Sequence, residues 1–229
     1  MRMRLGSFWR HRVIGPELNA FLMGEGPTDY AFLTVLLERA LGELPICRKL
    51  SVAPVQRLQV NVGDPLGRHR AICNAAREAA SSLSVLFVHY DGSAVVERES
   101  GKYWDPLCRE WQEFGPADRL LLRVVPVREM ESWALADRQT LQSVVGASWN
   151  AKEIFEGGKI EHPEDLSDPK RTLRDIIAAG RTKRRARRDP HDYLPLIAER
   201  MNLRSLERLS SFRLWQHETE SALAGLKPD

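Results

Sequence analysis

The sequence predicts an α/β protein, in which a mostly parallel four-stranded sheet carries helices on its faces and a helical part follows it. Two observations lead to this fold class. Between residues 17 and 127, short apolar runs of strand length alternate with segments whose apolar residues recur at helical spacing. After about residue 129 the strand-like runs stop and helical patterns continue. Strand–helix alternation is typical of parallel sheets, because two parallel strands need a long crossover connection.

The first half of the alternating region contains two strand–helix units. The apolar run at 17–23 predicts a buried strand. Pro27 suits the first position of the helix that follows, where its missing N–H is not needed, and Gly42 offers that helix a C-terminal stop. Residues 57–63 alternate apolar and polar side chains, which predicts a half-buried strand, and residues 68–80 carry an alanine-rich helix face.

The second half of this region repeats the pattern. The run "SVLFVHY" at 84–90 predicts a buried strand that ends at Asp91, and the helix-like residues 106–114 follow it. The valine-rich run at 119–127 predicts the fourth strand. Every predicted strand except the last is thus followed by a helix of the length that a crossover needs.

These patterns divide the chain into three predicted parts, which are a basic N-terminal segment at 1–16, an α/β core at 17–146 and a helical extension at 147–229. Within the extension, Asp168 is expected to cap a helix that begins at Pro169. A basic run at 181–188 follows that helix.

Cationic side chains are concentrated in two places, although the net charge is only +3. Residues 1–12 and the run "RTKRRARR" at 181–188 contain no acid. Clusters of this kind attract polyanions, nucleic acid first among them, and the alternative is a solvated, charged loop. The second cluster consists of Arg181, Lys183, Arg184, Arg185, Arg187 and Arg188.

Cysteine usage and hydropathy exclude several classes of protein. The three cysteines are far apart and form no CxxC pair, which argues against a disulfide framework or a structural zinc site and favours a reducing cytosol. No apolar run approaches the roughly 18 residues of a membrane span. The N-terminus is basic but lacks the apolar region of a secretory signal. We therefore expect a cytoplasmic protein with no membrane partner.

The candidate acidic residues follow the first, third and fourth predicted strands. Glu25 follows the first, Asp91 the third, and Glu129 and Glu131 the fourth. Ligands of open parallel sheets bind outside the carboxyl ends of the strands, so we expect these carboxylates to share one edge of the sheet. They would repel one another unless a hard divalent cation such as Mg²⁺ or Mn²⁺ neutralised them.

The corner around Glu25 has two glycines. We expect Gly24 and Gly26 to let the backbone turn sharply and leave the Glu25 carboxylate open to metal and phosphate. Acids at strand–helix junctions also cap helices and gain from the helix dipole. Spacing alone leaves both interpretations open.

At these residues the sequence resembles the TOPRIM domains, the metal-binding fold shared by topoisomerases, primases and OLD-family nucleases. "GEGPTDYAFL" resembles the first TOPRIM motif, and "VHYDGS" resembles the second, a strand that ends in Asp-x-Asp. The segments "REMESWALAD", "LSDPKRTL" and "LSSFRLWQHETESAL" are similar to a TOPRIM-like family of small prokaryotic proteins, some of them encoded beside ATPases in phage-defence or mobile loci. The resemblance spans residues 18–225 and implies a Rossmann-like TOPRIM core.

The resemblance also implies roles for single residues. Glu25 matches the TOPRIM glutamate, which is implicated in metal binding or in acid–base work on the leaving oxygen. Asp91 matches the first Asp of Asp-x-Asp, and Ser93 replaces the second with a weaker, neutral metal ligand. Glu131 matches the family's Glu before Trp, and either it or Glu129 is expected to complete the site.

The implied function is a nuclease that cuts phosphodiester bonds of DNA or RNA with Mg²⁺ or Mn²⁺, in a prokaryotic defence or mobile-element system. Glu25, Asp91 and Glu131 form its expected catalytic set, and Lys170 together with the basic run is expected to approach the phosphate backbone.

Two alternatives remain at this point. A catalytically degenerate TOPRIM fold could serve as a binding or regulatory subunit of an ATPase complex, and Ser93 motivates that reading. The "YDGS" stretch is also similar to the Asp-x-Asp-Gly-Thr motif of haloacid-dehalogenase phosphatases, but His89 stands where their nucleophilic aspartate belongs. A Walker loop is absent, so we do not expect this chain itself to hydrolyse ATP.

Overall fold

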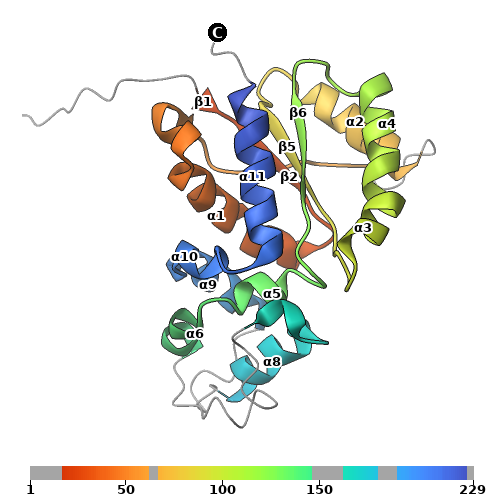
Figure 1. Cartoon of the computed structure of the whole chain (residues 1–229). Coiled ribbons are helices and arrows are strands. Elements are labelled where there is room, and N and C mark those ends of the chain that lie inside the picture. Colours follow the sequence, from red (N-terminus) through yellow and green to blue (C-terminus); the bar gives the residue numbers. More distant parts are fainter. Residues whose placement is uncertain (1–16, 62–66, 146–161, 180–189, 226–229) are drawn as a thin grey trace, which may run out of the picture.

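The structure is a computed structural model of the chain, and it describes residues 17–61, 67–145, 162–179 and 190–225 (Figure 1). The basic segment predicted at 1–16 and the basic run at 181–188 lie outside these residues. In the part of the chain described, no helix is both long enough and apolar enough to cross a membrane.

The predicted fold class is confirmed. Four strands form one fully parallel sheet in the spatial order β4 (Gln56–Arg57), β2 (Ala20–Met23), β5 (Val85–His89) and β6 (Leu120–Val124). The register places Ala20 opposite Val85, and Val85 opposite Leu120. All four strands therefore end at the same edge of the sheet.

The first and second predicted strands differ in extent from those observed. The run at 17–23 divides into β1 (Glu17–Leu18) and β2, and β1 pairs with β3 (Ser51–Val52) in a separate two-stranded sheet. Asn19 is the point of division, because its carbonyl accepts the amide of Ser84 (2.9 Å) just before β5. The strand predicted at 57–63 is two residues long, although the Leu58 amide still binds the Leu22 carbonyl (2.8 Å).

Successive side chains along β2 and β5 pack alternately into two separate hydrophobic cores. Ala20 and Leu22 of β2 point into a large core that also contains helices from the C-terminal part, whereas Phe21 and Met23 point into a smaller one. In β5, Phe87 joins the large core, while Leu86 and Val88 join the smaller one. This two-residue period on a sheet buried on both faces explains why all five side chains of β5 are buried.

Helices cover each face of the sheet (Figure 1). The smaller core lies beneath α2 (Arg68–Glu78) and α4 (Asp105–Phe114), and between β5 and α4 the chain forms α3 (Val96–Glu99) and the π-helical turn η2 (Ser100–Trp104).

On the other face lies α1 (Pro27–Glu43), which begins at the predicted proline. Gly42 is not its stop, because the helix runs one residue further and Leu44 caps it in an extended conformation.

The C-terminal part is helical, as predicted. Its elements are α5 (Glu131–Ala134), α6 (Arg138–Val145), η4 (Pro163–Asp165), α8 (Pro169–Ala179), η5 (Pro190–Tyr193), α9 (Leu194–Arg200), α10 (Leu203–Leu206) and α11 (Ser210–Ala224). The 3₁₀ turn η1 (Pro45–Lys49) follows α1. Contacts of α9 with α1 and of α11 with β6 join this part to the sheet in one continuous core.

A cluster of aromatic residues joins the segment "ESWALAD" to the last helix. The Trp133 indole donates a hydrogen bond to the Ser211 hydroxyl (2.7 Å), and its ring meets Phe212 edge-on at 5.2 Å. Trp215 lies between this pair and Phe87 of β5, with ring centroids 6.0 Å apart. Trp133 is thus a fully buried core residue, with α11 as its main neighbour.

Aspartates cap two helices of the C-terminal part, and the cap predicted at Asp168 is confirmed. The Asp137 carboxylate accepts the amide of Thr140 (3.1 Å) at the start of α6. The Asp168 carboxylate accepts the amide of Arg171 (2.8 Å), and α8 begins at Pro169.

Candidate functional site

The strand order creates a crevice at one point of the sheet edge. From β2 the chain crosses to β4 on one side, and it then returns to β5 on the other side of β2. Connections that leave in opposite directions from two adjacent parallel strands open a crevice at their carboxyl ends, where ligands of such sheets bind. Glu25 follows β2 and Asp91 follows β5, so both acids lie at this point.

A cavity of about 390 Å³ occupies the crevice. Four acidic residues line it, namely Glu25, Asp91, Glu99 and Glu129. Arg128 is the cation in its wall, and Tyr103, Ser93, Ala94 and Ser167 complete the lining. The structure thus brings together Glu25, Asp91, Glu129 and Ser93 from the set predicted to bind a metal.

The corner that carries Glu25 is held by a residue within the first helix. The Asp29 carboxylate accepts the backbone amides of Glu25 (2.7 Å) and Gly26 (2.8 Å) through the same oxygen. The Tyr30 hydroxyl accepts the amide of Gly24 (2.9 Å). These bonds satisfy the free amides at the start of α1 and set the direction in which the Glu25 side chain leaves the backbone.

The sharp turn expected at the two flanking glycines is found at neither, because neither has a positive φ. A β-carbon at Gly24 would lie 3.0 Å from Cβ of Asp29, so the close approach of α1 favours a glycine there. Gly26 has ordinary extended backbone (φ −150°), and an added β-carbon would meet nothing nearer than Thr28 at 3.9 Å. Packing of Asp29, rather than a sharp turn, explains the glycine before Glu25.

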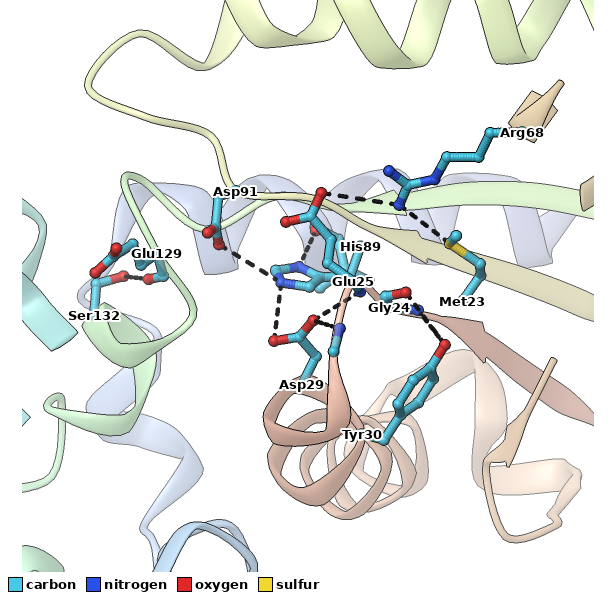
Figure 2. A network of polar contacts seen from close by, with 12 residues as sticks. Met23, Gly24, Glu25, Asp29, Tyr30, Arg68, His89, Asp91, Glu129 and Ser132 are labelled. Carbon is cyan, nitrogen blue, oxygen red and sulfur yellow. Dashed lines mark hydrogen bonds and ion pairs between the residues drawn. The ribbon is translucent and has the colours of Figure 1, made fainter. Parts of the chain in front are cut away.

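His89 lies between the carboxylates of Asp29 and Asp91 (Figure 2). It is buried, with 1% of its surface exposed, as expected from its place in a strand. Its Nδ1 donates a hydrogen bond to the Val124 carbonyl (2.9 Å), because a carbonyl oxygen can only accept. Its Nε2 lies 3.9 Å from Oδ1 of Asp29 and 3.7 Å from Oδ1 of Asp91. The imidazole therefore links the corner of β2 to the end of β5.

The acids of the crevice disfavour one another's charge. Burial raises the pKa of Asp91 to about 6, the charges of Asp29 and Glu129 add to the effect, and Lys170 and the Met130 amide oppose it. Burial and the charge of Asp91 also raise the pKa of Glu25, against His89 and Arg68. Carboxylates that share a site in this way favour a bound cation.

Glu131 lies behind the wall of the cavity. It is 7% exposed and is not among the residues that line the cavity. Burial raises its pKa to about 7, Glu129 and Asp91 raise it further, and its own backbone amide and Lys170 lower it. Glu131 thus lies within the electrostatic field of Asp91 and Glu129 without opening onto the same space.

The loops after β5 and β6 are clamped together across the site. Ser93 and Arg128 pair in an antiparallel bridge, and both have positive φ angles, 48° and 63°. Non-glycine residues in this region cost on the order of 1–3 kcal/mol, and such strain clusters at functional sites. Gly92 allows the clamp, because a β-carbon there would lie 2.5 Å from the Pro126 carbonyl oxygen.

Three cations surround the acidic cavity. Nη2 of Arg68 lies 3.9 Å from Oε1 of Glu25. Arg128 donates from Nη1 to the Ser167 carbonyl (3.3 Å), and its buried Nε has no hydrogen-bond partner among the described residues. Lys170, at the start of α8, is exposed, and its backbone amide binds the Glu129 carboxylate (3.2 Å). The other predicted nucleic-acid contacts, Arg181, Lys183, Arg184, Arg185, Arg187 and Arg188, lie outside the described residues.

The residues present fit a metal ion in part. Within the described ranges, no group of three or more His, Cys, Asp or Glu side chains is arranged to hold a metal. Mg²⁺ is commonly held by only one or two carboxylates, with waters and substrate phosphates as its other ligands. Glu25 and Asp91 are the candidates for this smaller set. Burial is the main cause of their raised pKa values, and the smaller part that comes from neighbouring carboxylates is the repulsion that a cation would relieve.

A second cavity of about 580 Å³ lies between β6, η2 and α11. Its wall is mainly apolar, with Trp104 and Leu122 among its residues, and the ion pair of Arg123 with Glu218 (2.5 Å) crosses it. It has neither the acidic cluster nor the strand ends of the first cavity, so the candidate site is the smaller of the two.

Sequence reasoning missed several residues of the site. Asp29 has the third helical position after the capping residue Gly26, so the spacing "GPTD" was a usable signal. Arg68, Arg128 and Tyr103 carry no such signal, because each reaches the crevice from a different connection.

Comparison with known proteins gives one assignment. A family model described as a domain of unknown function, DUF4276, matches residues 24–218. No curated protein and no solved structure matches the chain. The matched range begins at the corner that carries Glu25 and includes every residue of the crevice.

Proposed function

Since the chain belongs to the DUF4276 family, whose description names no activity, we propose its function from the site: a metal-dependent nuclease that cleaves phosphodiester bonds of DNA or RNA. Cations around the crevice, carboxylates within it and the resemblance of its motifs to TOPRIM domains all support this proposal.

One observation carries the proposal furthest. Glu25 and Asp91 end adjacent parallel strands, line one cavity and stand where the strand order reverses. Two carboxylates repel a phosphate, because both groups are negatively charged. A cation bound between the carboxylates and the phosphate would remove this repulsion. Mg²⁺ or Mn²⁺ bound there would polarise the phosphate and provide an activated water.

The chain's own residues have separate tasks in this proposal. Glu25 and Asp91 hold the ion, and Asp29 and His89 fix the spacing between them through the contacts described above. Arg128 and Lys170 face the same acidic space and are placed to bind phosphate oxygens of the strand. Glu131 is a buried acid whose charge acts electrostatically on Asp91 and Glu129 without lining the cavity.

The sequence motifs support the same function. "GEGPTDYAFL" contributes Glu25, and "VHYDGS" contributes Asp91, in the order of the TOPRIM motifs. The likeness to proteins encoded beside ATPases supports a role in prokaryotic defence or in a mobile element.

A second candidate function, a regulatory subunit without catalysis, is supported by two separate observations. Ser93 is neutral where a second aspartate is expected, and the described residues contain no three-donor metal group. Both features suit a TOPRIM-like subunit that has lost catalysis and binds or regulates an ATPase partner.

The test compares two site variants with two control variants. Glu25→Gln and Asp91→Asn remove one charge each with almost no change in shape. Glu113→Gln and Asp118→Asn make the same changes at exposed positions outside the cavity lining. Each protein is incubated with Mg²⁺ or Mn²⁺ and with single-stranded and double-stranded DNA and RNA, or with the small diester bis(4-nitrophenyl) phosphate.

The nuclease proposal expects cleavage by the wild type and both controls, and a loss of about 100-fold or more in both site variants. Equal cleavage by all five proteins would remove Glu25 and Asp91 from the chemistry. No cleavage and no calorimetric binding of Mg²⁺ or Mn²⁺ at millimolar concentration would favour the regulatory subunit.

A further inference from the structure

We propose that Tyr103 is a stacking platform for an unpaired nucleobase, so that the cavity takes a single strand and not a duplex. This inference rests on the proposed nuclease function and names its substrate class.

The Tyr103 ring is unusually accessible for an aromatic side chain of this protein. It is 41% exposed, and it is the aromatic member of the four large hydrophobic side chains that are exposed in the described residues. The ring lines the same cavity as Glu25 and Asp91. Among the described residues, Tyr90 is the aromatic ring that contacts Tyr103, and it does so on one side only.

The side of the ring that faces Tyr90 has firm support. Tyr103 packs against Tyr90 with ring centroids 5.7 Å apart and an angle of 39° between the planes. Tyr90 is buried, and its hydroxyl forms a hydrogen bond with the Ser100 hydroxyl (3.1 Å), which also accepts Nη1 of Arg123 (3.1 Å). The platform is therefore held in place before any ligand arrives, which lowers the entropy cost of stacking.

The backbone beneath the ring points independently to a binding role. Tyr103 belongs to the π-helical turn η2, between α3 and α4. Such turns are rare and occur frequently at functional sites, because the extra residue changes the direction of the side chains that follow. In this turn two consecutive side chains line different cavities: Tyr103 lines the acidic cavity, and Trp104 lines the apolar one.

The size of the cavity selects the kind of nucleic acid. Its volume of about 390 Å³ is near the lower end of the range of small-molecule sites, about 300–1,000 Å³. That space suits one nucleotide unit. A base inside a duplex has both faces covered by its neighbours, whereas an unpaired base offers a free face to an aromatic ring.

The test replaces the ring and varies the strand. Tyr103→Leu removes the aromatic face but keeps apolar bulk, Tyr103→Phe keeps the face, and Leu214→Ala on α11 is a control at a similarly exposed apolar position outside the cavity. Steady-state cleavage with Mn²⁺ is measured on a short single strand, on the same strand annealed to its complement, and on an abasic strand of the same length, which has the phosphodiester backbone but no aromatic base.

The wild type is expected to prefer the single strand. For Tyr103→Leu we expect a KM for the single strand that is about 5- to 150-fold higher, with the KM for the abasic strand unchanged. Tyr103→Phe and Leu214→Ala are expected to behave as the wild type. This pattern separates a binding role of the ring from a general defect in folding or chemistry.

Two results would overturn the inference. One is an unchanged KM of Tyr103→Leu for the single strand. The other is a wild type that cuts the duplex as well as, or better than, the single strand. Cleavage of the abasic strand that needs Glu25 and Asp91, at the same rate as the strand with bases, would leave the metal chemistry standing and reject the stacking site alone. Failure of every substrate would reject both.

Discussion

The carboxylate of Asp29 binds the backbone amide of Glu25 at 2.7 Å, so a buried acid inside the first helix positions an exposed acid outside it. The other oxygen of Asp29 faces His89, whose Nε2 also faces Asp91. Two connections that are more than sixty positions apart in the chain are thereby held in one arrangement (Figure 2).

The first prediction concerns this capping contact. Asp29→Ala leaves the amides of Glu25 and Gly26 without their acceptor, and we expect the free energy of unfolding to fall by about 1–2 kcal/mol. Asp29→Asn keeps one acceptor oxygen and should lose less. Urea unfolding measures both, with the exposed Glu38→Ala on the same helix as the control. A denaturation midpoint for Asp29→Ala equal to that of Glu38→Ala would show that the cap contributes nothing.

The second prediction concerns pH. The pKa of Glu131 rises from 4.5 to about 7 on folding, so the folded state binds this proton more tightly than the unfolded state does. The stabilisation is therefore complete below about pH 4.5 and is lost as the pH rises through about 7. We expect Glu131→Gln, which mimics the protonated acid, to remove this loss, on the order of 2–3 kcal/mol.

The measurement for this second prediction is urea unfolding of metal-free protein at pH 5 and pH 8. The raised pKa of Asp91 also makes the protein less stable as the pH rises. The contribution of Glu131 is therefore the change in unfolding free energy between pH 5 and pH 8 in the wild type minus the same change in Glu131→Gln. Parallel pH profiles for the two proteins would mean that Glu131 is not a buried, proton-binding group.

The third prediction concerns metal removal. If Glu25 and Asp91 hold a divalent ion, Mn²⁺ stabilises the folded state by mass action, about 1.4 kcal/mol at ten times its dissociation constant. Thermal unfolding at pH 8 should show a higher Tm with Mn²⁺ and a return to the original value with EDTA. Asp91→Asn should show neither change, whereas Asp118→Asn should respond as the wild type. The same Mn²⁺ shift in Asp91→Asn would place the ion elsewhere.

The fourth prediction concerns the clamp between the two loops. Gly92→Ala introduces a β-carbon 2.5 Å from the Pro126 carbonyl oxygen, so the loops must separate. We expect a loss of about 1–3 kcal/mol together with a loss of nuclease activity. Gly42→Ala adds the same methyl group to α1, where nothing lies within 4 Å, and should stabilise the protein by about 0.5–1 kcal/mol. Calorimetric unfolding compares them, and an unchanged Tm for Gly92→Ala would contradict the packing described here.

Much of the fold could be predicted because it depends on local patterns. The apolar runs ending at Met23, His89 and Val124 read as strands from their own composition, and Pro27 marked the start of α1. The extent of β4 could not be predicted, because an alternating segment becomes a strand only as far as a neighbour pairs with it.

The candidate site divides in the same way. The sequence by itself determined that Glu25 and Asp91 follow strands of a parallel sheet, and parallel strands end at one edge, so a shared edge followed from local patterns. The strand order, which makes β2 and β5 neighbours, was decided by the tertiary structure. Only the tertiary structure decided that Glu131 is buried behind the cavity, that Asp29 and His89 link the two acids, and that Tyr103 opens onto them. The physical reason is that burial, pKa and exposure are set by atoms from connections far apart in the chain, and no local pattern records which of those atoms will be neighbours.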